Sequence, residues 1–153
     1  MIKQIYGNLL EQEYNIIAHQ VNCKGVKGGG LALQIKKKYY NVYKEYFYLC
    51  HNAKKSSDLL GSIQPIKTNK QQYIVNVFGQ DDFGKNKKQT DYNALNLALS
   101  KLHAFMKEKQ LNTIGFPYKF GSGLAGGDWN VVFNMIKKEF DDDKNIICYI
   151  VQY

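Results

Sequence analysis

Two glycine-rich stretches decide the fold of this sequence. Residues 15–32 read NIIAHQVNCKGVKGGGLA, and residues 112–129 read NTIGFPYKFGSGLAGGDW. Each stretch begins with a short apolar run that contains β-branched residues, which is typical of a buried strand. A cluster of glycines follows each run, and an amphipathic helical pattern begins after it. The order strand, glycine loop, helix therefore occurs twice in the chain.

The segments around these stretches continue the alternation. We expect strands over residues 2–6, 15–21, 61–67, 73–78, 112–116 and 146–151, and helices over residues 31–39, 42–52 and 129–140. Thr90 is expected to cap a further, long helix with an apolar stripe of Tyr92, Leu95, Leu99, Leu102 and Phe105. This order indicates an α/β fold with helices on both faces of a mostly parallel or mixed sheet. The length of 153 residues fits a single domain over 1–153.

Lysine supplies all of the basic residues counted in the net charge of this sequence. The sequence has 21 lysines, no arginine and 13 acidic residues, which gives a net charge of +8. Lysine attracts anions as a point charge, whereas arginine offers the planar fork that nucleic-acid readers use. The basic excess therefore indicates an anionic ligand or weak attraction to polyanions.

Cysteine usage and hydropathy narrow the class of protein further. The three cysteines, Cys23, Cys50 and Cys148, form no CxxC motif, so we expect neither a disulfide framework nor a metal site. The N-terminus lacks the apolar segment of a signal peptide, and no apolar run approaches the roughly 18 residues of a membrane span. We expect a cytoplasmic monomer that does not bind a membrane.

The two glycine loops are the candidate binding site. In an open α/β sheet, ligands bind beyond the carboxyl ends of the strands. A glycine-rich turn there lets backbone N–H groups approach a phosphate, and the helix N-terminus behind it adds partial positive charge. Two such loops can hold a diphosphate, although one glycine run alone is equally well a tight turn. The absence of GxxxxGK[ST] excludes a P-loop NTPase, and the first loop does not match GxGxxG.

The residues in these loops resemble a known family. Residues 19–25 and 28–32 look like the first half of a macro domain, and residues 116–118 and 121–129 look like its second half. The resemblance covers essentially the whole chain. It is closest to the small macro domains that include terminal ADP-ribose protein glycohydrolase, DNA-ADP-ribose-removing antitoxins and yeast-type ADP-ribose 1''-phosphate phosphatase. It implies a three-layer α/β/α domain with a mixed central sheet that binds ADP-ribose.

The resemblance also implies roles for individual residues. Asn22 corresponds to the asparagine near the distal ribose, with a turn-capping asparagine as the alternative. Asn8 and Leu9 fall near the adenine end of the ligand. The implied ligand-binding residues are Asn8, Leu9, Asn22, Gly28, Gly29, Gly30, Leu31, Gly121, Ser122, Gly123, Leu124 and Ala125.

The catalytic positions match the family less well. The lysine and aspartate of the glycohydrolase relatives fall at Gln80 and Ala125, and neither side chain can act as a nucleophile or general base. The catalytic candidates that remain are Asn22, His19 and Asp128. His19 has the chemistry of an acid or base near neutral pH, and its alternative is a hydrogen-bonded core histidine. Asp128 can orient water, and its alternative is to cap the last long helix.

These residues predict an ADP-ribosyl hydrolase that needs no cofactor. It would remove ADP-ribose from a modified protein or nucleic acid, so nucleic acid would be a partner only as a modified substrate. A phosphatase acting on ADP-ribose 1''-phosphate is the first alternative, and a non-catalytic ADP-ribose reader is the second. A weak nucleic-acid binder, suggested by the net charge, predicts affinity that falls steeply with salt.

Overall fold

A six-stranded sheet forms the centre of the described part of the chain. The structure is a computed structural model, and it describes residues 1–27, 30–69, 71–84, 88–123 and 125–153. The strands are β1 (Ile2–Tyr6), β2 (Ile16–Val21), β3 (Ile63–Asn69), β4 (Gln72–Phe78), β5 (Thr113–Pro117) and β6 (Ile147–Gln152). They lie in the order β1-β6-β5-β2-β4-β3, and among these described strands only the β3–β4 pair is antiparallel. The predicted mixed sheet is confirmed.

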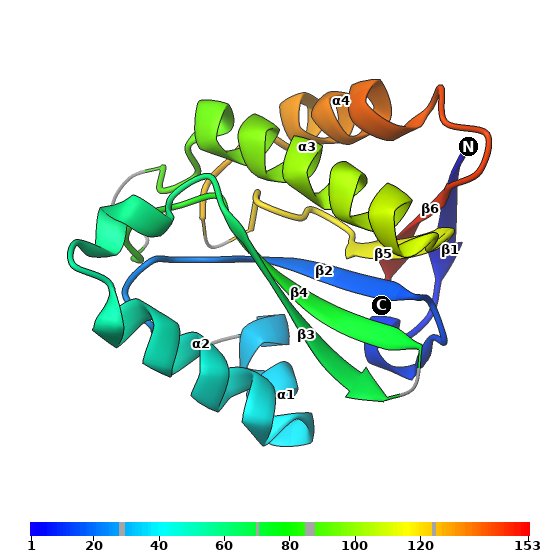
Figure 1. The fold of residues 1–153 in the computed structure, drawn as a ribbon. Helices are drawn as coiled ribbons and strands as arrows, with labels where there is room; N and C mark the ends of the chain where they lie inside the picture. Colours follow the sequence, from blue (N-terminus) through cyan, green and yellow to red (C-terminus); the bar gives the residue numbers. More distant parts are fainter. Residues whose placement is uncertain (28–29, 70, 85–87, 124) are drawn as a thin grey trace.

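Helices cover both faces of this sheet, which gives the predicted three layers (Figure 1). The helices α1 (Gly30–Lys38) and α2 (Tyr40–Asn52) lie on one face, and α3 (Tyr92–Lys109) and α4 (Trp129–Phe140) lie on the other. Two short 3-10 helices, η1 (Leu9–Glu11) and η2 (Ser56–Leu59), connect the larger elements. No helix in the described ranges is both long and apolar enough to cross a bilayer.

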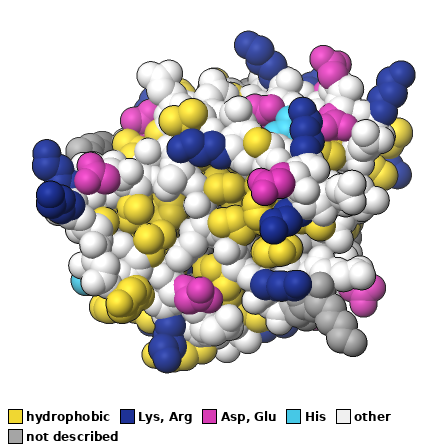
Figure 2. All heavy atoms as spheres, in the orientation of Figure 1, with side chains coloured by type: hydrophobic (Ala, Val, Ile, Leu, Met, Phe, Trp, Pro, Cys, Tyr) yellow, Lys and Arg dark blue, Asp and Glu magenta, His cyan; other side chains and the backbone are white. Residues whose placement is uncertain are grey.

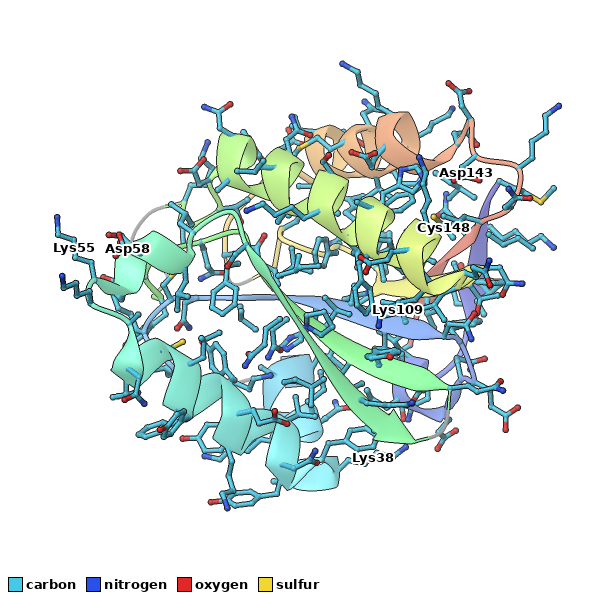
Figure 3. All side chains as sticks on the ribbon, viewed as in Figure 1. Lys38, Lys55, Asp58, Lys109, Asp143 and Cys148 are labelled. Carbon is cyan, nitrogen blue, oxygen red and sulfur yellow. The ribbon has the colours of Figure 1, made fainter. Side chains whose placement is uncertain are left out.

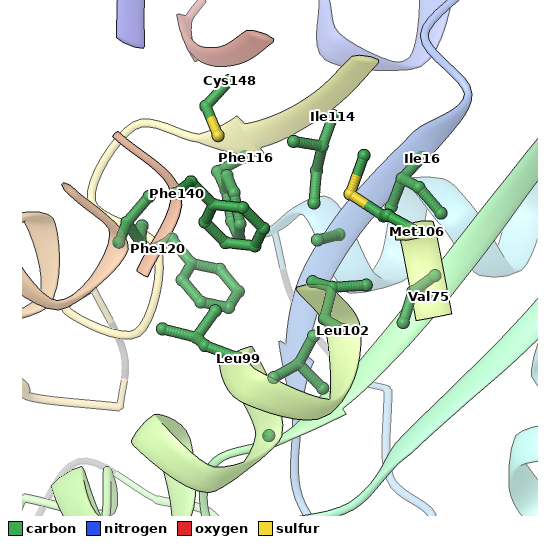
Figure 4. Packing of buried hydrophobic residues seen from close by; sticks show 14 of the residues in the cluster. Ile16, Val75, Leu99, Leu102, Met106, Ile114, Phe116, Phe120, Phe140 and Cys148 are labelled. Carbon is green, nitrogen blue, oxygen red and sulfur yellow. The ribbon is translucent and has the colours of Figure 1, made fainter. Parts of the chain in front are cut away.

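The strand β2 is buried on both faces because it lies between two parallel neighbours and two helical layers. Ile16 and Ala18 face the larger core cluster under α3 and α4, whereas Ile17 faces the smaller cluster under α1. Figure 4 shows Phe116 of β5 and Phe140 of α4 packed together in the larger cluster. This rigid core fixes the strand ends from which the glycine loops emerge.

The prediction that Thr90 caps α3 is wrong by one residue. Asp91 is the N-cap, and its carboxylate accepts a hydrogen bond of 3.0 Å from Ala94 N. Threonine and aspartate are both favourable caps, so the sequence alone did not separate them. The Thr90 hydroxyl instead donates to Gly121 O at 2.6 Å, which ties the start of α3 to the second glycine loop.

Candidate functional site

A cavity of about 550 Å³ lies at the carboxyl ends of β2, β4 and β5. Its volume is in the range of roughly 300–1,000 Å³ that is typical of small-molecule sites. The described residues that line it come from three segments: 19–22, 26–27 and 30–32 in the first, 80 and 83–84 in the second, and 117–123 and 125 in the third. Among the described lining residues there are two lysines, Lys27 and Lys119, and no carboxylate. The cavity therefore suits an anionic ligand. We call residues 22–29 loop 1 and residues 118–128 loop 2.

The structure brings most of the predicted site residues to this cavity. The predicted residues that line it are His19, Asn22, Gly30, Leu31, Gly121, Ser122, Gly123 and Ala125. Asn8, Leu9 and Asp128 do not line it. Gly28, Gly29 and Leu124 lie outside the described residues. The cavity therefore joins loop 1 and loop 2, as the repeated strand–loop–helix order predicts.

Asn22 shapes loop 1 from within. Its Oδ1 accepts hydrogen bonds from Lys24 N at 2.9 Å and from Val26 N at 3.3 Å, and its Nδ2 donates to Val26 O at 2.9 Å. The hydroxyl of Tyr46, from α2, lies 2.6 Å from Asn22 O and 2.8 Å from Oδ1. These bonds correspond to the turn-capping alternative. Among the described residues, these bonds use one of the two amide hydrogens of Asn22.

Lys27 anchors loop 1 to the sheet. Its side chain points inward and the residue is only 3% exposed. The amine lies 2.8 Å from His19 Nε2 on β2 and 3.1 Å from Asn76 Oδ1 on β4. None of its partners among the described residues is a carboxylate, and burial lowers the pKa of Lys27 to about 7. A lysine that would ordinarily be a surface cation is therefore a buried and weakly charged anchor.

His19 belongs to the same cluster. Its Nε2 lies 2.9 Å from Asn76 Oδ1. Burial, with a smaller effect of the Lys27 charge, holds the pKa of His19 well below its usual value, so the imidazole is neutral at pH 7. This environment corresponds to the hydrogen-bonded core histidine that the sequence left as an alternative.

Hydrogen bonds to backbone atoms hold loop 2, and its glycines leave room for these bonds because they have no side chain. The carbonyl of Gly121 accepts from the Thr90 hydroxyl at 2.6 Å and from Gly127 N at 3.2 Å. A Cβ atom on Gly127 would collide with that same carbonyl oxygen, so only glycine fits there. Lys119, at the cavity rim, has a φ of +63°, an uncommon conformation for a residue with a side chain. Loop 2 thus presents its backbone to the cavity.

Gln80 and Ala125, the positions at which the resemblance puts the relatives' lysine and aspartate, both line the cavity. Gln80 Oε1 accepts a 2.8 Å hydrogen bond from Gln20 Nε2, and Gln80 Nε2 donates to Asp82 O at 2.7 Å. Gln20 Nε2 also lies 2.9 Å from the Thr90 hydroxyl. Gln80 is therefore part of a polar network that connects β2, the segment after β4 and loop 2.

The residues that the structure places elsewhere have clear local roles. Asp128 is the exposed N-cap of α4 and accepts from Asn130 N at 2.8 Å. Asn8 caps η1 by accepting from Leu10 N at 3.0 Å, and Leu9 is buried in the core cluster under α1. The turn after β1 packs Leu9 against Ile35 of α1 and Val42 of α2, and neither Asn8 nor Leu9 is among the described residues that line the cavity.

Sequence reasoning missed four residues that position the loops: Gln20, Lys27, Asn76 and Thr90. One signal was available, because Gln20 and Asn76 interrupt otherwise apolar strands. A polar side chain in a buried strand needs a hydrogen-bond partner, and such partners are often part of a site. The role of Lys27 had no comparable signal in the sequence.

The fold and cavity define an α/β domain with a ligand-sized site between two glycine loops. Residues 18–136 match the family model described as Macro domain, and the chain belongs to that family. An ADP-ribose 1''-phosphate phosphatase of Saccharomyces cerevisiae strain YJM789 is 33% identical, covering 97% of each chain. A DNA ADP-ribosyl glycohydrolase of Mycobacterium tuberculosis is 24% identical, covering 97% of this chain and 42% of the relative.

Solved structures agree on the fold. A Bacteroides thetaiotaomicron protein superposes with a TM-score of 0.86 over the whole of both chains, at 24% identity. The macrodomain of Thermus aquaticus DarG superposes with a TM-score of 0.83 at 23% identity, and the match covers 100% of this chain and 98% of that chain. At these identities the likeness establishes the architecture, and residue roles must be argued from the site. The family and the three-layer fold that the sequence predicted are confirmed.

Proposed function

We propose that this chain binds ADP-ribose between loop 1 and loop 2 and hydrolyses a bond at the distal ribose of that ligand. The observation that carries the proposal is the convergence of both glycine loops on one cavity. The described residues that line this cavity include the exposed Lys119 and the buried, weakly charged Lys27, but no carboxylate. A diphosphate joined to two sugars matches such a site in charge and size, and the family relatives named above act on ADP-ribose derivatives.

In this proposal the diphosphate lies between the loops. The described cavity lining includes Gly30, where α1 begins, and Gly121 to Gly123 of loop 2. Backbone N–H groups at a helix N-terminus and in glycine turns bind phosphate oxygens without steric hindrance. The exposed Lys119 at the rim adds a positive charge near the ligand. Binding and orientation of the distal ribose then supply part of the rate enhancement.

The leading reaction is glycoside hydrolysis. Water attacks C1'' of the distal ribose, the bond to the modified protein or nucleic acid breaks, and ADP-ribose is released. Asn22 is a positioning residue that holds loop 1, and its second amide hydrogen is available to a ribose hydroxyl. His19 also positions loop 1, through its contact with Lys27, and Asp128 caps α4.

The buried thiols Cys23, Cys50 and Cys148 fit the reducing cytoplasm, where we propose that the protein acts.

A second reaction has a specific observation in its favour. Relatives described as ADP-ribose 1''-phosphate phosphatases reach 33% identity over 97% of both chains, whereas the glycohydrolase relatives reach 25% and extend well beyond this chain. In that reaction water attacks the phosphorus of the 1''-phosphate, and inorganic phosphate and ADP-ribose are released. The same cavity serves both substrates because both place a group on C1''.

One parallel assay tests these proposals. The protein is incubated with an ADP-ribosylated glutamate peptide, with ADP-ribosylated DNA and with ADP-ribose 1''-phosphate, and free ADP-ribose and phosphate are measured. Release of ADP-ribose from the peptide or the DNA supports the glycohydrolase, and release of phosphate supports the phosphatase. If no substrate is turned over while ADP-ribose still binds, the protein is a reader and both reactions are excluded.

A further inference from the structure

The positive charge of this protein is concentrated in one segment. Residues 36–55 contain six lysines and one acidic residue, Glu45, so they carry five of the eight net positive charges. The same 20 residues contain six tyrosine or phenylalanine side chains. This segment comprises the end of α1, all of α2 and the turn after it. Interleaved lysine and aromatic residues are the pattern of surfaces that bind single-stranded nucleic acid.

The aromatic rings of α2 form a strip along its outer face. Tyr40, Tyr43, Phe47 and His51 follow one another at helical spacing, with ring centroids 5.9, 5.9 and 3.9 Å apart. Tyr40 is 58% exposed and Phe47 is 42% exposed, while the adjacent Tyr48 is 71% exposed. Figure 2 shows hydrophobic side chains at the surface over α2, at the lower left of the view. An apolar strip this exposed is a candidate binding surface. We call Tyr40, Tyr43, Phe47, Tyr48 and His51 the aromatic strip.

Lysines flank the aromatic strip. Lys36 Nζ lies 4.2 Å from the ring centroid of Tyr43, and Lys44 is exposed one helical turn from both Tyr40 and Tyr48. Lys55, after the end of α2, projects from the molecule, with Asp58 beside it in η2 (Figure 3). Exposed rings therefore extend along a helix of 13 residues, roughly 20 Å long, which carries Lys44, with Lys36 of α1 beside it and Lys55 after its end.

The aromatic strip ends beside the cavity. A Cβ atom on Gly25 of loop 1 would lie only 2.9 Å from His51 Cε1, and Gly25 has a φ of +81°. His51 therefore contacts loop 1 directly. Val26, the next residue of loop 1, lines the cavity. A polymer lying on α2 would thus lead to the rim of the proposed ADP-ribose site.

We propose that the aromatic strip of α2 binds single-stranded nucleic acid. Bases stack on Tyr40, Phe47 and Tyr48, and the phosphates pair with Lys36 and Lys44, because every base has a π-face and every phosphate a charge. The lack of arginine disfavours bidentate reading of base edges in a duplex. The binding itself is independent of the proposed function. Only the further step, in which a modified nucleotide of the bound strand enters the cavity, rests on that function.

Fluorescence anisotropy with a labelled 12-nucleotide oligothymidine tests the proposal. We expect binding of the full chain at low salt, weakening linearly on a log–log plot against salt concentration. The double substitution Phe47→Ala with Tyr48→Ala should weaken binding by about tenfold or more, because two stacking platforms are lost. Lys36→Gln with Lys44→Gln should lower the salt slope by about 1.4, the value for two phosphate contacts on a single strand.

Matched controls separate stacking from general attraction. Tyr153→Ala removes an exposed ring far from α2 in sequence, and Lys137→Gln with Lys138→Gln removes two charges from α4; both should leave oligothymidine binding unchanged. Calorimetry with free ADP-ribose on the Phe47→Ala, Tyr48→Ala protein should match the unsubstituted chain, which keeps the two proposals distinct.

Three results would overturn the proposal. The first is absence of oligothymidine binding at low salt. The second concerns the Phe47→Ala, Tyr48→Ala protein: either it binds oligothymidine as tightly as the unsubstituted chain does, or its affinity for polyglutamate falls as much as its affinity for oligothymidine. Polyglutamate offers charge without bases. The third is a dimer in sedimentation that this substitution dissociates, because a second copy of the chain would then cover α2.

Discussion

Loop 1 and loop 2 border the same cavity, but they are held in opposite ways. In the described part of loop 1, buried polar side chains make the bonds: Asn22 caps the turn, and Lys27 reaches His19 and Asn76. In loop 2, the carbonyl of Gly121 accepts from Gly127 N and from the Thr90 hydroxyl, and Gly127 leaves room for this contact. One loop depends on the chemistry of its side chains, and the other depends on their absence.

This difference predicts distinct sensitivities. The shape of loop 1 should respond to loss of hydrogen-bonding groups and to pH, because its anchor Lys27 is a buried titratable group. The shape of loop 2 should respond to added volume and remain indifferent to pH, because its bonds are mainly to backbone atoms. Substitutions in each loop therefore test the comparison directly.

Asn22→Ala should have the largest effect. It removes the acceptor of the Lys24 and Val26 amides and a partner of the buried Tyr46 hydroxyl, so the free energy of unfolding should fall by about 3 kcal/mol. Urea denaturation measures this. Asn8→Ala is the matched control, because Asn8 also caps a turn but lies outside the described cavity lining; it should cost about 1 kcal/mol or less. Equal costs would contradict the special role of Asn22.

Gly127→Ala should act next most strongly, through loop 2. The added methyl group collides with Gly121 O and forces the backbone apart, so we expect a loss of about 2 kcal/mol in stability. The affinity of this variant for ADP-ribose should also be about tenfold lower. Gly123→Ala is the control for stability, because no atom of the described residues beyond its chain neighbours lies within 4 Å of its added Cβ. If both variants unfold at the same urea concentration, loop 2 is not limited by volume.

Lys27→Met should reveal the pH sensitivity of loop 1. The pKa of Lys27 is about 7 in the folded chain against an ordinary value of 10.5, so above pH 7 the unfolded chain holds the proton that the folded chain releases. Stability of the unsubstituted chain should therefore rise by about 2 kcal/mol from pH 7 to 9 and become flat below about pH 6. Lys27→Met should remove this rise and stabilise the protein by about 1–2 kcal/mol at pH 7.

The exposed Lys119 provides the control for this experiment. Lys119→Met removes a positive charge from loop 2 and leaves Lys27 with its partners His19 and Asn76 in place, so the rise in stability above pH 7 should remain. Denaturation curves at pH 6, 7, 8 and 9 compare the three proteins. A Lys27→Met protein that keeps the rise above pH 7 would assign the titration to another group.

Tyr46→Phe should give the smallest effect. It removes only the hydroxyl that lies 2.6 Å from Asn22 O, so a loss of about 1 kcal/mol is expected. Tyr92→Phe is its counterpart at loop 2, where the hydroxyl accepts from the exposed Asp128 N, and should cost less than about 0.5 kcal/mol. Reversed values would mean that α3 supports loop 2 more than α2 supports loop 1.

The elements and the outline of the site could be predicted because their signals are local. The apolar runs before each loop became β2 and β5, and the stripe from Leu95 to Leu102 is buried as its spacing predicts. The alternative role of Asp128 as a helix cap followed from its place before Trp129, and its bond to Asn130 N agrees. Capping preferences alone did not place the start of α3, because Thr90 and Asp91 are adjacent and both are favourable caps.

Contacts between distant segments explain what the sequence did not predict. Lys27 looks like a surface cation beside three glycines, yet it is buried because β4 brings Asn76, 49 residues away, to its amine. Asn8 and Leu9, which the resemblance puts near the adenine end of the ligand, are not among the described residues that line the cavity, and Leu9 packs in the core cluster with Ile35 and Val42. Such placements follow from tertiary packing, which a single sequence does not specify.

Titration calorimetry with ADP-ribose is the most direct test that the two loops form one nucleotide site. We predict saturable binding of one ADP-ribose per chain, with affinity reduced about tenfold by Gly127→Ala and by Asn22→Ala alike, since each holds one side of the same cavity. Absence of binding at millimolar ADP-ribose, or binding that neither substitution weakens, would contradict the proposal that the two loops form one nucleotide site.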